Sequence, residues 1–209
     1  MPLQNRVTPD GRIIAVAARG TLMGNRGILH DGNRQLGRSR WKNQGWVACL
    51  LEFKGRKREL MTPGRYTELF FLDEAVSLAA GHRPCVRCRS GDYRSFHECW
   101  SRAHPGRDWK AADIDRHLHV CRVIRWRREQ VTYSADLAAL TDGVFVQLPG
   151  ETSPMLVLGD RLLPYSPDGY GAAVERRAIE VTVLTPEPTV RTLAAGYRPA
   201  VHATAGNGR

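Results

Sequence analysis

Short apolar runs separated by polar turns occupy the first third of the chain and predict β-strands. RIIAVAA (12–18) and TELFF (67–71) have the length of strands. Both are rich in β-branched or aromatic residues, which favour a pleated, half-buried backbone. We therefore expect the chain to begin with a sheet.

A third apolar run, WVACLLEF (46–53), is followed by Lys54-Gly55 and then by RKRELMT (56–62). Glycine between two such runs is typical of a hairpin turn, so this segment predicts a β-hairpin. The outward side chains of its second strand, Arg56 and Arg58 among them, would give that hairpin a basic surface.

The pattern then changes to helical spacing. Asp73 predicts the N-cap of a short helix that runs through Leu78 and is closed by Gly81 in the left-handed conformation. After CVRC (85–88), the segment GDYRSFHECWSRAH repeats large apolar groups on one helical face. These groups are Tyr93, Phe96 and Trp100. ADIDRHLHVCRVIRWRRE (112–129) predicts a further helix whose inner face carries Ile114, Leu118 and Cys121.

Beyond residue 130, β-like runs alternate with Asp-Gly, Pro-Gly and Pro-Asp-Gly turns. EVTVLT (180–185) predicts a strand, TVRTLAAG (189–196) a closing helix, and HATAGNGR (202–209) a disordered tail. The patterns together predict an α+β fold. A basic unit over 1–130 would contain the β-hairpin and a helix–CxxC–helix element, and a small β-rich unit over 131–209 would pack against it.

One internal similarity joins the two parts. LAAGHRP (78–84) and LAAGYRP (193–199) match at six of seven positions. A helix closed by glycine, with proline close behind it, explains both copies. A duplicated module is the alternative.

Charge separates the two parts. Residues 1–129 hold 25 Lys and Arg against 13 Asp and Glu, whereas residues 130–209 hold 6 against 8. Only four of the 31 basic residues are lysine. Arginine binds phosphate as a bidentate fork and stacks on bases, so this basic part indicates contact with nucleic acid.

The remaining composition excludes several classes. No apolar run approaches the roughly 18 residues of a membrane-spanning helix, so no membrane partner is expected. MPLQNRVTPDGR (1–12) lacks the apolar middle of a signal peptide, which predicts a cytoplasmic protein. Five cysteines are an odd number, so reduced thiols or metal ligands are expected rather than a disulfide framework.

Cys85 and Cys88 have the Cys-x-x-Cys spacing of a zinc knuckle, in which a tight turn directs two thiolates at one tetrahedral ion. One such pair needs further ligands. His117 and Cys121 share a helical face at i and i+4, and we expect them to complete a zinc site. Cys49, on the predicted hairpin, is the next candidate.

The segment ELFFLDEAVSLAAGHRPCVRC (68–88) resembles the second half of the Ada-type metal-binding domain of bacterial DNA alkylation-repair regulators. The resemblance consists of a phenylalanine pair, an alanine-rich helix and Gly-aromatic-Arg-Pro-Cys-x-x-Cys, here Phe70, Phe71, Ala75, Ala79, Ala80, Gly81, His82, Arg83, Pro84, Cys85 and Cys88. It implies a DNA-contacting, zinc-held substructure. The family's first ligand pair has no counterpart in FKGRKRELMTPGR (53–65), so its methyl-transfer chemistry is not expected.

The leading prediction is a nucleic-acid-binding protein, with DNA as its partner, in repair, regulation or defence. Its contacts would come from Arg56, Arg58, Arg83, Arg87, Arg89, Arg125, Trp126, Arg127 and Arg128. Trp41, also among cations, is a second candidate for base stacking. The alternative is a metal-dependent or acid–base enzyme acting on nucleic acid or nucleotides, with His30, Asp31, Asp115 and His119 at its centre. A basic protein-interaction module with structural cysteines is a third reading.

Overall fold

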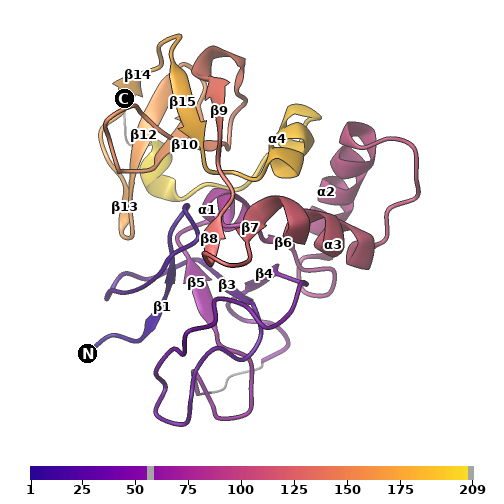
Figure 1. Ribbon diagram of the computed structural model, residues 1–209, viewed down its shortest axis with the longest axis vertical. Coiled ribbons are helices and arrows are strands. Elements are labelled where there is room, and N and C mark those ends of the chain that lie inside the picture. The colour runs from indigo at the N-terminus through magenta and orange to yellow at the C-terminus, as the bar shows by residue number, and fades with distance from the viewer. Residues whose placement is uncertain (56–58, 207–209) are drawn as a thin grey trace.

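The computed structural model describes residues 1–55 and 59–206 (Figure 1). The described chain is a mixed α+β structure with four α-helices. The first sheet has six strands in the order β2-β1-β5-β3-β4-β6. They are β1 (Gln4–Val7), β2 (Ile13–Ala15), β3 (Leu22–Asn25), β4 (Val47–Leu50), β5 (Leu69–Phe71) and β6 (Arg83–Pro84). The strands expected within 12–18, 46–53 and 67–71 are thus present.

The predicted hairpin is not formed by the described residues. β4 pairs antiparallel with β3 and parallel with β6, so both of its edges are occupied. Residues 59–62 form no strand: Met61 is buried with a positive φ of 52°, and its N–H donates to the Glu68 carboxylate. Arg56 and Arg58 lie outside the described residues.

The short helix and its two boundaries are confirmed. α1 spans Glu74–Ala79, and the Asp73 carboxylate accepts the N–H of Val76. Gly81 has a φ of +78°, and the N–H of His82 reaches back to the carbonyl of Ser77. A left-handed glycine with this return bond satisfies the last carbonyls of the helix.

The longer helices follow their apolar faces. α2 spans Ser90–Ala103 and buries Phe96, Cys99 and Trp100, whereas Tyr93 is only partly buried. α3 spans Ala111–Arg122 and buries Ile114 and Leu118.

The predicted extension of α3 to residue 129 is wrong. Val123 leaves the helix with extended backbone, and β7 (Val123–Ile124) pairs with β8 (Glu129–Gln130). Arg128 takes a positive φ of 57° in the turn between them. The adjacent β-branched residues Val123 and Ile124 favour a strand, and the arginines that follow lie in its turn.

The second sheet has the order β13-β12-β11-β10-β15-β9, with β14 paired to β12. Its strands are β9 (Tyr133–Asp136), β10 (Phe145–Gln147), β11 (Met155–Leu158), β12 (Arg161–Ser166), β13 (Gly169–Tyr170), β14 (Val174–Glu175) and β15 (Glu180–Val183). This part of the chain also contains the 3-10 helix η1 (Leu137–Ala139) and the α-helix α4 (Glu187–Ala194). The β-rich character of this part, the strand within 180–185 and the closing helix are confirmed.

Residues 202–206 of the predicted disordered tail are ordered, and residues 207–209 lie outside the described residues. η2 spans Ala203–Gly206, and the N–H of His202 donates to the Asp73 carboxylate at 2.8 Å. Asp73 therefore holds both the start of α1 and the C-terminal segment.

The two sheets share an apolar core. In Figure 1 the second sheet lies above the first, with α1 between them. One cluster joins Val7 and Phe71 of the first sheet to Phe145 and Leu156 of the second. A second cluster packs α2 and α3 on the other part of the second sheet. The repeated LAAG segment ends a helix in both places, since Gly81 and Gly196 have φ of +78° and +109°. No helix in the described ranges is long and apolar enough to cross a membrane.

Candidate metal centre

Three cysteines meet where β4, β6 and the start of α2 converge. Cys49 lies on β4, Cys85 directly follows β6, and Cys88 lies in the turn that leads into α2. The three sulfur atoms are all within 4.8 Å of one another. The parallel pairing of β4 and β6 brings the cysteines together. The pairing extends one residue beyond β6, where the Cys85 N–H donates to the Ala48 carbonyl at 3.0 Å and so holds Cys85 beside Cys49.

Backbone N–H groups surround the sulfurs of the turn. Those of Arg87 and Cys88 donate to the Cys85 sulfur, and that of Leu50 donates to the Cys88 sulfur. Such hydrogen bonds favour the thiolate form, which is the form that binds metal.

The pKa values of the three cysteine thiols are shifted in different directions. The pKa of Cys85 is lowered, first by the hydrogen bond from the Cys49 thiol and then by the backbone N–H groups, which together outweigh burial. The pKa of Cys49 is raised by that same bond and by burial, and burial raises the pKa of Cys88. One thiolate is thus favoured in the metal-free cluster, and a bound cation would release the other protons.

The donor set fits zinc. Zinc takes thiolate ligands in a tetrahedron with a Zn–S distance of about 2.3 Å, which places sulfurs about 3.8 Å apart. The three sulfurs are close enough that small side-chain rotations reach this spacing. All three cysteines are free and partly exposed, so an ion and a fourth ligand have access.

The structure places Cys49, and not the expected pair of Cys121 and His117, beside Cys85 and Cys88. His117 instead packs its ring against Trp100, His104 and Trp109, with ring centroids 5.4–5.8 Å apart. This face of α3 is directed to α2 and the aromatic core. Within residues 1–55 and 59–206, the only group of three or more potential ligands is Cys49, Cys85 and Cys88.

The arginines proposed for phosphate contact divide into buried and exposed groups. Arg83 and Arg89 are buried: Arg83 pairs with Asp115 at 2.7 Å, and Arg89 pairs with Glu74 at 2.7 Å. Both guanidiniums are therefore used inside the protein and are not available as surface contacts. Arg128 is exposed, and it donates to the Arg38 carbonyl.

The exposed arginines lie in two turns, the Cys-x-x-Cys turn and the turn between β7 and β8. Arg87 is exposed inside the Cys-x-x-Cys turn. Arg125 and Arg127 are exposed between β7 and β8, on either side of Trp126, which is 90% exposed. A tryptophan this exposed has no role in the core.

The four residues proposed for an enzyme, His30, Asp31, Asp115 and His119, form two pairs in different parts of the fold, and each residue has its own hydrogen-bond or ion-pair partner. His30 is buried and bonds Thr67 Oγ1 through Nδ1 at 2.7 Å, and Asp31 accepts the loop N–H groups of Asn33 and Gln35. On α3, Asp115 pairs with Arg83 and His119 contacts Arg122. Each of the four thus has a structural partner in the described chain.

Residues 68–88 have the local order β5, α1, β6 and then the Cys-x-x-Cys turn. No family model matches the chain, and neither a curated protein nor a solved structure matches it.

Proposed function

We propose that the protein binds DNA through its arginine-rich N-terminal part, in repair, regulation or defence, and that a zinc ion on Cys49, Cys85 and Cys88 stabilises the binding surface. The observation that carries this proposal is the convergence of three sulfurs within 4.8 Å at a turn that exposes Arg87. A zinc ion there would join β4, β6 and α2, and would fix the position of that arginine.

The exposed cations support a phosphate-binding role. Arg87, Arg125 and Arg127 are exposed. Arginine is well suited to bidentate contact with phosphate oxygens. Trp126, between two of these arginines, provides a free aromatic face on which an unpaired base can stack.

Two measurements test the proposal on the full chain. We expect zinc at about one equivalent per chain, lost in Cys85→Ser. Binding of a DNA duplex should weaken steeply between about 50 and 200 mM salt, because cations on the protein displace counterions from phosphate. Arg125→Ala combined with Arg127→Ala should reduce the salt slope by about two.

A matched control is Arg177→Ala, which removes a cation that is 76% exposed in the second part of the chain. It should leave both DNA affinity and salt slope unchanged. DNA affinity that does not vary with salt, or a chain that purifies without zinc and takes up none, would contradict the proposal.

A further inference from the structure

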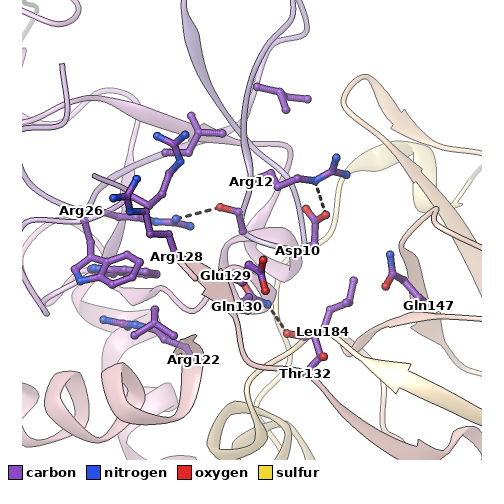
Figure 2. Close-up of a pocket in the computed structure, with 17 residues that line it drawn as sticks. Asp10, Arg12, Arg26, Arg122, Arg128, Glu129, Gln130, Thr132, Gln147 and Leu184 are labelled. Atoms are coloured by element: carbon purple, nitrogen blue, oxygen red, sulfur yellow. Dashed lines mark hydrogen bonds and ion pairs between the residues drawn. The ribbon is translucent and has the colours of Figure 1, made fainter. Parts of the chain in front are cut away.

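A cavity of about 510 Å³ lies between the two sheets, beside the β7–β8 hairpin (Figure 2). Its wall includes five arginines, namely Arg12, Arg26, Arg40, Arg122 and Arg128. The wall also holds two carboxylates, Asp10 and Glu129, and Asp10 is paired with Arg12 at 2.6 Å. The cavity therefore has a surplus of positive charge.

Two of these arginines are buried against one tryptophan. Arg26 and Arg122 are 2% and 1% exposed, and Trp46 is 3% exposed. The guanidinium carbons of Arg26 and Arg122 lie 4.2 and 3.8 Å from the centroid of the Trp46 ring. Contact with the π face stabilises each cation in part, but it supplies no negative charge.

The hydrogen-bond partners of both guanidiniums are neutral. Arg26 donates to the carbonyls of Gly11 and Ala80 at 3.1 and 3.3 Å, and it lies 3.4 Å from His82 Nε2. No carboxylate in the described chain forms an ion pair with it. A buried cation without a counter-charge is costly.

Arg122 likewise forms no ion pair with a carboxylate among the described residues, and the nearby charge of Asp115 offsets only part of the lowering of its pKa. It donates to the carbonyls of Gly81 and Gln44 at 2.5 and 2.6 Å and contacts His119 Nδ1, while its buried Nε has no hydrogen-bond partner among the described residues. Burial and the neighbouring Arg26 lower the pKa of Arg122 well below its ordinary value. Burial and Arg40 lower the pKa of Arg26 to about 9. An anion in the cavity would relieve both effects.

An aromatic surface adjoins the cations. Trp41 is partly exposed, its ring centroid lies 6.1 Å from that of Trp46, and it lines this cavity and a neighbouring one of about 590 Å³. A cavity of this size falls in the range of small-molecule sites, about 300–1,000 Å³. Cations beside a partly exposed aromatic ring match the two halves of a nucleotide.

We infer that this cavity binds one nucleotide, with the phosphate on Arg26 and Arg122 and the base against Trp41. The nucleotide has two sources: a free mononucleotide, or one unit of a bound strand that is turned out of its stack. The second source rests on the proposed DNA binding; the first does not. The site differs from the cysteine cluster and uses other residues.

The test titrates the full chain with a deoxynucleoside monophosphate, the matching deoxynucleoside, inorganic phosphate and single-stranded DNA, each followed by calorimetry. We expect saturable binding of the monophosphate, at least tenfold tighter than either the nucleoside or phosphate alone. Trp41→Ala should weaken the monophosphate about tenfold, because stacking of a base is lost.

Arg26→Gln should abolish monophosphate binding, but this buried change can also unfold the chain. Arg40→Ala, at a half-buried position of the wall, is the second variant and should weaken the monophosphate severalfold with the melting temperature unchanged. Arg177→Ala, which lies outside the cavity, should have no effect.

The outcomes separate the two proposals. Salt-dependent DNA binding without saturable monophosphate binding, and with full affinity in Trp41→Ala, would overturn the nucleotide site and leave DNA binding intact. Monophosphate binding without DNA binding would support the site, with the free nucleotide as its source, and overturn DNA binding. Phosphate bound as tightly as the monophosphate would overturn the role given to Trp41.

Discussion

Arg83 and Asp115 form a bidentate ion pair in the interior, with Nε and Nη2 of the arginine 2.8 and 2.7 Å from the two carboxylate oxygens. The side chains are 5% and 13% exposed. Arg83 belongs to β6, two residues before Cys85, and Asp115 to α3. The pair therefore fastens the helix to the strand that leads into the cysteine cluster.

Asp115→Asn should lower the free energy of unfolding by about 3 kcal/mol, because it leaves the Arg83 guanidinium buried without its counter-charge. Urea unfolding followed by circular dichroism measures the change. Replacing both partners, Arg83→Met with Asp115→Leu, should recover much of the loss. Glu175→Gln, which affects a surface pair with Arg177, should change little. An Asp115→Asn variant as stable as the parent would show that the pair contributes nothing.

Cys49→Ser should reduce bound zinc as strongly as Cys88→Ser does, because the three sulfurs form one site. Cys121→Ser should keep the zinc content of the parent chain. Elemental analysis of purified variants gives the metal-to-chain ratio. If Cys121→Ser loses the metal and Cys49→Ser retains it, the ligand set argued from the structure is wrong.

Stability should fall as the pH decreases from about 6.5 toward 4. Burial, together with Arg122 and Arg125, lowers the pKa of His119 to about 4, so this ring stays neutral in the folded protein while the unfolded chain takes up a proton near pH 6.5. The unfolded state then binds more protons, and each such histidine contributes up to about 1.4 kcal/mol per pH unit. His82, whose pKa is also lowered by burial, acts in the same direction.

His119→Gln should therefore flatten the pH dependence of the urea midpoint in this window without removing it. Burial raises the pKa of Asp73, which has the opposite effect on the slope, so the variant is compared with the parent at each pH. Equal slopes in variant and parent would contradict a neutral, buried His119.

Gly81→Ala should destabilise the protein by about 1–3 kcal/mol. The φ of Gly81 is +78°, and a Cβ there would lie 2.5 Å from Cδ of the buried Arg122. Gly91→Ala is the control, because a Cβ at that position in α2 has no heavy atom within 4 Å and alanine favours a helix. Equal melting temperatures for Gly81→Ala and the parent would contradict the strain argument.

Local signals in the sequence predicted the elements that depend on local bonds. Asp73 and Gly81 defined the two ends of α1 because capping involves only neighbouring residues. Pairing between distant segments was not predictable in this way. The described residues do not form the predicted hairpin, because the partners of β4 are β3 and β6, which are far from it along the chain.

The same limit applies to the candidate site. The spacing of Cys85 and Cys88 predicted two ligands, but Cys49 reaches them only through the parallel pairing of β4 and β6. His117 and Cys121 have a spacing that suits two metal ligands on one helical face. That spacing does not reveal what the face packs against, which is the aromatic core. Arg26 was missed entirely, since an isolated arginine in a loop has no sequence pattern that indicates burial.

The contacts of Gln130 bear on whether the two parts of the chain can be expressed as separate fragments. Its amide nitrogen lies within hydrogen-bonding distance of the carbonyls of Pro9, Ala79 and Leu184, and Figure 2 shows the contact with Leu184. One side chain at the end of β8 therefore links the N-terminal segment, α1 and the second sheet. The apolar clusters cross the same boundary. Fragments 1–130 and 131–209, expressed alone, would each expose core surface, and co-expression of the two would be the route to recovering them in solution.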